Sequence, residues 1–254
     1  KFYESIVKGP LGEEVSATWG VMGDGETAVI EMARASGLVL VPPKQRDPRR
    51  TTTYGTGQLI QESFLKGYKK IIIGIGGSAT NDGGSGMAQA LGAKLLDADG
   101  TEIDFGGSAL NNLVSIDMSE FSELAPQVNV VIATDVNNPL CGKTGASAVY
   151  GPQKGATPNI VQELDRALEK YARVVKTDIG ADVAGIPGAG AAGGLGAGLM
   201  AFLGAETYSG IDLVCDVLNL DQYLEEADVV ITGEGSVDSS TVYNKAPVGV
   251  AKRA

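Results

Sequence analysis

The segment of residues 71–86 constrains the fold of this chain more than any other segment. Three consecutive isoleucines, Ile71 to Ile73, lead into a glycine-rich turn that ends where a helix is expected to start, near Gly84. A short β-branched run predicts a buried strand, and glycine allows positive φ and close approach of a ligand to the backbone. The pattern therefore predicts a strand, a binding turn and a helix.

The same turn carries hydroxyl, amide and carboxylate side chains. Backbone N–H groups at the start of a helix attract phosphate and other anions. A carboxylate beside such groups commonly holds a metal ion or accepts a proton. We expect Asp82 to be this acidic helper. The residues expected to bind a phosphate or carboxylate are Gly76, Gly77, Ser78, Thr80 and Asn81.

Strands and helices alternate along the chain, which predicts an α/β fold with a mixed or largely parallel sheet. Helices are expected over residues 58–67 and 84–91, and another begins at Pro158 after the cap residue Thr157. A second glycine-rich turn, residues 185–198, is expected to lead into a further packed helix. The expected buried strands are residues 27–31, 70–75, 128–134 and 229–232.

Composition excludes several classes of function. The net charge is −11, from 20 Lys and Arg against 31 Asp and Glu, which argues against binding to nucleic acid or to an anionic membrane surface. Histidine is absent, so a Ser-His-Asp triad and a histidine-ligated zinc are impossible within these residues. Acid–base chemistry must fall to Asp, Glu, Lys or Tyr.

Cysteine and hydropathy patterns bear on location. Cys141 and Cys215 are far apart and form no CxxC pair, so we expect free thiols in a reducing compartment, the cytoplasm. No run of about eighteen apolar residues is present, so no membrane span is expected.

Two more polar groups lie near expected element ends, where ligands of open α/β sheets bind. Asp135 follows the strand of residues 128–134 and precedes two asparagines. It either binds a metal ion or a hydroxyl group, or bonds its own backbone in an Asx turn. Lys154 precedes the helix at Pro158. It either adds positive charge to an anion site or is a solvated surface lysine.

An acidic turn follows the last expected strand. It contains Glu234 and Asp238, and Lys245 comes shortly after. Two carboxylates and a lysine suit Mg²⁺ and a polyphosphate. We therefore expect Glu234 and Asp238 to hold Mg²⁺ or shape the phosphate site, with Lys245 as a catalytic cation.

Residues 74–79 also match the loose dinucleotide fingerprint GxGxxG/A. That fingerprint requires an acidic residue at the end of a second strand about twenty residues further on. Asp97 and Asp99 lie at about that distance, but in a turn-like sequence. A nicotinamide-dependent oxidoreductase is thus one alternative. The Walker A pattern is absent.

Together these segments resemble the bacterial glycerate kinase family, of the glycerate 2-kinase type, along essentially the whole chain. The longest shared motifs are GIGGSATNDGG at residues 74–84 and GPQKGATP at residues 151–158. Several such motifs in the same order are more specific than any one alone. The others lie at residues 9–12, 28–33, 53–57, 133–135, 187–194 and 232–235.

The resemblance implies ATP- and Mg²⁺-dependent phosphorylation of D-glycerate to 2-phosphoglycerate, with Asp82 or Asp135 orienting or deprotonating the hydroxyl. The resemblance implies that the protein binds D-glycerate and ATP and neither nucleic acid nor a membrane. It is compatible with a homo-oligomer. A non-catalytic module that binds an organic acid is a second alternative.

The resemblance also implies two α/β domains, one of them discontinuous with the other inserted. Residues 1–230 would be mainly the inserted domain, and residues 231–254 would begin the return to a truncated Rossmann- or flavodoxin-like domain. The family's first segment and the part beyond Ala254 are missing, so the chain resembles a fragment. It also has Ser236 where the family usually has arginine, which removes a bidentate phosphate or carboxylate contact, and Ser240 where glutamine is usual.

Overall fold

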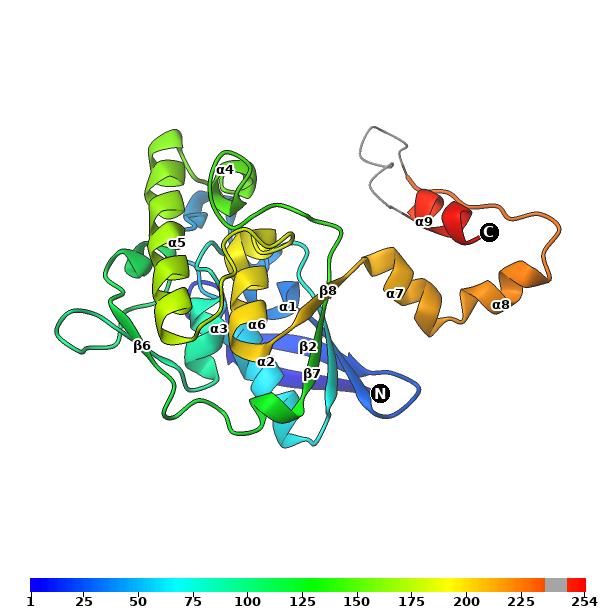
Figure 1. The fold of residues 1–254 in the computed structure, drawn as a ribbon, viewed down its shortest axis with the longest axis horizontal. Coiled ribbons are helices and arrows are strands. Elements are labelled where there is room, and N and C mark those ends of the chain that lie inside the picture. The colour runs from blue at the N-terminus through cyan, green and yellow to red at the C-terminus, as the bar shows by residue number, and fades with distance from the viewer. Residues whose placement is uncertain (236–245) are drawn as a thin grey trace.

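Six strands form one sheet in the computed structural model, which describes residues 1–235 and 246–254 (Figure 1). Their spatial order is β1-β2-β3-β4-β7-β8. β3, β4, β7 and β8 run parallel, while β2 is antiparallel to both β1 and β3. The fold is therefore mixed α/β with a mostly parallel sheet, as predicted. The bounds are Phe2–Lys8 (β1), Glu14–Val21 (β2), Thr27–Glu31 (β3), Lys70–Gly74 (β4), Asn129–Ala133 (β7) and Glu206–Tyr208 (β8).

Three of the four predicted strands are confirmed, as β3, β4 and β7. One side of this central sheet lies in the core, because alternate residues of each strand point the same way. β-branched side chains suit this pleated, packed surface. The core residues on this side, each at most 2% exposed, are Ala28, Ile30, Ile71, Ile73, Val130 and Ile132.

The predicted strand at residues 229–232 is wrong. These residues form no strand, and Ile231 is 93% exposed. The position beside β7 is taken by β8, whose three residues are all exposed and lack an apolar run. β-branched residues favour a strand only where a neighbouring strand pairs with them. The antiparallel pair β1–β2 was also not predicted.

The helices before β8 lie mainly on one side of the sheet. Because the strand order in space is the order in sequence, right-handed crossovers bring the connecting helices to the same face. Contacts of α1 with β2, of α2 with β1 and β3, and of α6 with β7 agree with this arrangement (Figure 1). The bounds are Ala33–Ser36 (α1), Tyr54–Leu65 (α2), Ser85–Ala90 (α3), Ala146–Tyr150 (α4), Pro158–Asp178 (α5) and Leu195–Leu203 (α6).

α5 begins where the sequence predicted, with Pro158 in the first turn and the side chain of Thr157 accepting a hydrogen bond from Ile160 N. Its buried face packs on the turn before α3. A Cβ on Gly83 would lie 2.7 Å from the ring of Tyr171 and 3.2 Å from Leu168. A small antiparallel sheet, β5 (Lys94–Leu96) with β6 (Ser115–Asp117), stands apart from the main sheet.

After β8 the chain leaves the sheet and forms an outlying group of helices, α7 (Gly210–Val217), α8 (Leu220–Glu225) and α9 (Ala246–Arg253) (Figure 1). Arg253 holds them together through ion pairs to Asp212, Asp216 and Asp221 at 3.3, 2.6 and 3.1 Å. Several large apolar side chains of this segment are exposed, among them Val214 at 50%, Leu218 at 61% and Tyr223 at 69%. None of the helices in the described ranges combines the length and apolar character needed to cross a membrane.

Glycine at position 57 allows α2 to pack closely on α3. A Cβ there would lie 2.5 Å from the carbonyl oxygen of Met87 and 2.7 Å from the Cβ of Ala90. Gly57→Ala should lower the free energy of unfolding by about 1–3 kcal/mol, although alanine favours helix. Equilibrium urea unfolding measures this, with Gly23→Ala as control because a Cβ there meets no atom within 4 Å. A Gly57→Ala variant as stable as the wild type would contradict the packing.

Candidate active site

The carboxyl ends of β3, β4, β7 and β8 lie at one edge of the sheet, which we call the carboxyl edge. Gly76 and Gly77 follow β4 there and are exposed, and Asp135 follows β7 and is exposed. The turn of residues 9–13 lies at the same edge, because β1 runs in the same direction as β3. Ligands of α/β sheets bind at such an edge.

Asp135 is an exposed carboxylate of the carboxyl edge. Its Oδ1 accepts hydrogen bonds from Ser209 Oγ at 3.1 Å and from Gly210 N at 3.0 Å, at the start of α7. It therefore bonds a neighbouring element rather than its own backbone, unlike an Asx turn. No hydrogen bond to Oδ2 is formed within the described ranges, so this oxygen is available to a hydroxyl group.

Asp82, predicted to be catalytic, is instead fully buried. Its Oδ2 accepts hydrogen bonds from Thr53 N and Thr53 Oγ1, both at 2.8 Å, and its Oδ1 accepts one from Gly84 N at 3.2 Å. Thr53 Oγ1 also accepts a hydrogen bond from Met87 N at 2.9 Å. The protein itself thus occupies the N–H groups at the start of α3. This placement argues against contact between Asp82 and a substrate.

Burial shifts the titration of the Asp82 side chain. Loss of water around the carboxyl group raises its pKa, and hydrogen bonds from Thr53 and Gly84 oppose this rise. The hydrogen bonds partly replace the lost hydration of the charged form. They make Asp82 a structural acceptor inside the turn.

Lys154 and three other predicted ligand-binding residues are also buried. Lys154 is 1% exposed, and its Nζ donates to Thr80 O at 2.6 Å. Asn81 Nδ2 donates to Ser147 Oγ at 3.0 Å. Burial lowers the pKa of Lys154 to about 7, against the attraction of Asp82. The side chains of Ser78, Thr80, Asn81 and Lys154 are therefore buried, and those of Asn81 and Lys154 bond other parts of the protein, which argues against direct contact with a ligand at the surface.

A pocket of about 750 Å³ opens between the turn of residues 9–13 and the loop of residues 40–50. We call it the basic pocket. Its charged lining residues are Glu13, Lys44, Arg46, Asp47 and Arg50. Asp47 is paired outside this group with Arg49 at 2.7 Å, and that hydrogen-bonded contact lowers the pKa of Asp47. The three cations form no ion pair with any residue that the structure describes.

The basic pocket is not among the sites predicted from the sequence, although the sequence carries a signal for it. Four of the chain's 20 Lys and Arg lie within residues 44–50. Such clustering is informative in a chain with a net charge of −11, because it creates a local positive field. The local charge thus points to an anionic ligand where the overall charge does not.

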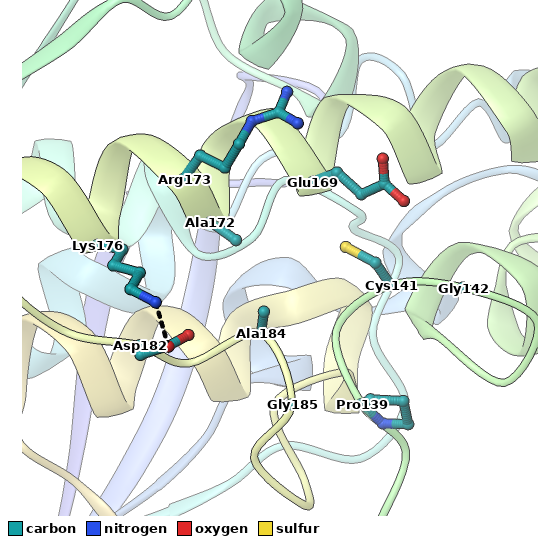
Figure 2. Close-up of a pocket in the computed structure, with 10 residues that line it drawn as sticks. All are labelled: Pro139, Cys141, Gly142, Glu169, Ala172, Arg173, Lys176, Asp182, Ala184 and Gly185. Atoms are coloured by element: carbon teal, nitrogen blue, oxygen red, sulfur yellow. Dashed lines mark hydrogen bonds and ion pairs between the residues drawn. The ribbon is translucent and has the colours of Figure 1, made fainter.

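A second pocket, of about 580 Å³, lies between α5 and two loops (Figure 2). Lys176 of α5 is paired there with Asp182 at 2.6 Å, and the Cys141 thiol lies near Glu169 (Figure 2). Burial, then Asp165 and Glu169, raise the pKa of Cys141 to about 12, so the thiol is protonated and unreactive at neutral pH. Cys141 and Cys215 are both free cysteines. This pocket is a weaker candidate site than the carboxyl edge.

The dinucleotide interpretation gains no support from the structure. Asp97 follows β5, which belongs to the small sheet, whereas the strands next to β4 are β3 and β7. Its Oδ1 accepts hydrogen bonds from Asp99 N and Thr101 N within its own turn, at 3.0 and 2.9 Å. It is therefore not placed as the acidic residue of that fingerprint.

The acidic turn is only partly described. Glu234 follows α8 in the chain and is half-buried. Asp238 and Lys245, like Ser236 and Ser240, fall outside the described residues, so their predicted roles stay predictions. Among the described residues, no three side chains of His, Cys, Asp or Glu form a metal-binding group.

Comparison with known proteins identifies the relatives of this chain. Residues 1–254 match the model of the glycerate kinase family. The chain is 56% identical over 245 residues to glycerate 2-kinase of Escherichia coli K12, covering 96% of this chain and 64% of the relative. It is 52% identical over 254 residues to glycerate kinase of Bacillus subtilis 168, covering 100% and 66%. The chain thus spans about two thirds of the length of these curated relatives.

The fold is shared with a solved structure. A crystal structure assigned as a glycerate kinase 2 from Salmonella typhimurium LT2 superposes with a TM-score of 0.93 at 53% identity. The match covers 100% of this chain and 68% of that chain. The carboxyl edge described above therefore belongs to a fold already seen in a relative.

Removing the Asp82 carboxylate should destabilise the protein. Asp82→Ala leaves Thr53 N and Gly84 N buried without that acceptor, so we expect a loss of about 3 kcal/mol in the free energy of unfolding. Urea unfolding measures this. The exposed Asp104→Ala serves as control and should change stability by less than about 0.5 kcal/mol. Equal stability of the two variants would contradict a structural role for Asp82.

Lys154 should make the fold more stable as the pH rises from 7 to 9. The unfolded chain keeps this proton up to the ordinary pKa of 10.5, whereas the folded chain releases it near 7. Folding therefore releases a proton in this window, and a higher pH favours the folded state. The difference in unfolding free energy between wild type and Lys154→Met should rise over this range in urea titrations. A difference independent of pH would refute this linkage.

Proposed function

The chain belongs to the glycerate kinase family, and on that premise we propose that the complete protein phosphorylates D-glycerate at its 2-hydroxyl group, with ATP as phosphoryl donor. The choice of the 2-hydroxyl follows the name of the Escherichia coli relative, glycerate 2-kinase. The reaction forms a bond between the hydroxyl oxygen and the γ-phosphorus and releases ADP and the hydroxyl proton.

One observation carries this proposal: an exposed carboxylate and a pocket rich in cations lie at the same edge of the sheet. Phosphoryl transfer depends mainly on positioning the reactants and on neutralising charge. Asp135 offers a free oxygen to a hydroxyl group, and Lys44, Arg46 and Arg50 offer positive charge to an anion. Both requirements are met by groups that lie outside the buried turn.

We assign the proton-handling role to Asp135. Its Oδ1 is fixed by Ser209 and Gly210, so Oδ2 has a defined direction. Oδ2 would accept a hydrogen bond from the glycerate hydroxyl and take its proton as the phosphorus–oxygen bond forms. The exposed backbone of Gly76 and Gly77 would contact a carboxylate or a phosphate without interference from a side chain.

Mg²⁺ and ATP enter as part of the proposal. When bound, Mg²⁺ neutralises charge on the transferring phosphates. It commonly takes only one or two protein carboxylates, and the remaining ligands are phosphates and water. Glu234 and Asp238 suit that small donor set chemically, and Lys245 would add a cation. These three assignments rest on the sequence.

The division into two domains is likewise a proposal. The chain leaves the sheet after Tyr208, and α7 to α9 hold to one another through Arg253. Their exposed apolar side chains favour packing against a further part of the protein. This supports a boundary near Ser209, earlier than the boundary after residue 230 that the resemblance implied.

A coupled assay on the complete protein with ATP, Mg²⁺ and D-glycerate tests the function. We expect ADP to form only when all three are present. Binding of D-glycerate without ADP formation would instead indicate an organic-acid-binding module. Enolase added without further enzymes identifies the product, because it consumes 2-phosphoglycerate but not 3-phosphoglycerate.

The role of Asp135 has its own test. Asp135→Asn removes the proton acceptor and should lower kcat by about 10²- to 10⁴-fold, with little change in the melting temperature. Asp99→Asn, an exposed change in the turn after β5 of the small sheet, should leave kcat unaffected. A near-normal kcat in Asp135→Asn would remove this residue from the mechanism.

A further inference from the structure

The basic pocket contains a hydrogen-bond donor without a partner. The Nε atom of Arg46 is buried and has no acceptor among the described residues. A buried donor left unpaired costs about 1–3 kcal/mol, so such groups usually meet an acceptor in the functional state. Arg46 lines the basic pocket, where Lys44 and Arg50 add two further cations.

The two carboxylates of the pocket, Glu13 and Asp47, offset only part of the charge of its three cations. Asp47 is engaged with Arg49 through three side-chain hydrogen bonds. Glu13 accepts a hydrogen bond from Leu11 N at 3.1 Å within its own turn. No salt bridge joins Lys44, Arg46 or Arg50 to a residue of the described part of the chain, although the charge of Arg50 contributes to the lowered pKa of Asp47.

The loop that carries the cations is held in place by its backbone. A Cβ on Gly155, at φ +97°, would lie 2.3 Å from Arg46 O. A Cβ on Gly106, at φ +98°, would lie 2.4 Å from Arg49 O. Ser108 also donates through both N and Oγ to Arg49 O at 3.1 Å. A loop fixed in this way loses little entropy on binding, which favours a specific site.

The pocket is also tied to the carboxyl edge. Leu38 N donates to Gly77 O at 2.8 Å, two residues before Leu40, which lines the pocket. Thr52 N donates to Pro10 O at 3.0 Å, and Pro10 lies beside Leu11 of the pocket wall. The pocket and the exposed Gly76-Gly77 turn are therefore parts of one continuous edge.

We propose that the basic pocket binds an oxyanion of a reactant, a carboxylate or a phosphate, through Lys44, Arg46 and Arg50. A guanidinium group bonds either oxyanion in a bidentate manner, so the shared chemistry is that of a small oxyanion. The assignment rests on the proposed function only in naming the reactants. The carboxylate source is D-glycerate, and the phosphate source is ATP or free phosphate.

Isothermal titration calorimetry on the complete protein tests this site with three separate probes: D-glycerate, inorganic phosphate and ATP. Arg46→Gln should weaken binding of at least one probe about 10- to 100-fold, and Lys44→Gln should weaken the same probe. The weakened probe identifies the source of the oxyanion. Lys44 is exposed, so its substitution does not endanger folding. Lys69→Gln removes an exposed cation just before β4, at the edge of the sheet opposite the carboxyl edge, and should change nothing.

Wild-type affinity of both pocket variants for all three probes would overturn the inference. An equal loss in Lys69→Gln would also overturn it, because the effect would then be one of general charge. No binding of any probe to the wild type would do the same. Kinase activity separates the two claims. If the wild type phosphorylates D-glycerate and both pocket variants bind every probe as the wild type does, the proposed function stands and the pocket assignment fails. If binding depends on the pocket but no ADP forms, the pocket assignment stands and the proposed function fails.

Discussion

The Asp82 carboxylate is the contact on which the site architecture depends. It joins the turn after β4 to Thr53 at the start of α2 and to the first residues of α3. One buried group thereby fixes the relative positions of a strand and two helices. Lys154 adds a second buried contact by donating a hydrogen bond to Thr80 O. Within the turn of residues 75–84, only Gly76 and Gly77 are exposed. The exposed part of the turn is thus supported by polar contacts inside the protein.

The polar side chains that stabilise the turn are different from the charged side chains that a ligand can reach. Most hydroxyl, amide and carboxylate groups of the glycine-rich turn face inward, and the charges available to a ligand come from other segments. Asp135 follows β7, and the loop before α2 carries Lys44, Arg46 and Arg50. The candidate site is therefore assembled from segments far apart in the sequence, each anchored by its own hydrogen bonds.

The central strands and α5 were predictable because their signals are local. β3, β4 and β7 are short β-branched runs, and Thr157-Pro158 is a helix start in sequence alone. β8 was not predictable in this way, since three exposed residues form it only by pairing with β7. Residues 229–232 show the opposite case, in which a suitable composition has no pairing partner among the described strands. For the site, the positions of the turns were predictable from the sequence, but not which of their side chains are buried and which are exposed. That choice depends on Thr53, which lies 29 residues before Asp82.

The sequential order of the strands has a consequence for how the sheet can form. Each new strand pairs with a neighbour that precedes it in the chain, from the β1–β2 pair through to β8. Among the described strands of this sheet, none must wait for a later one to fill a gap in its middle. Folding can therefore proceed in the direction of synthesis, with the sheet growing at one side as the chain emerges. The last of the described strands to join, β8, completes the carboxyl edge where Ser209 meets Asp135, so this part of the edge forms last.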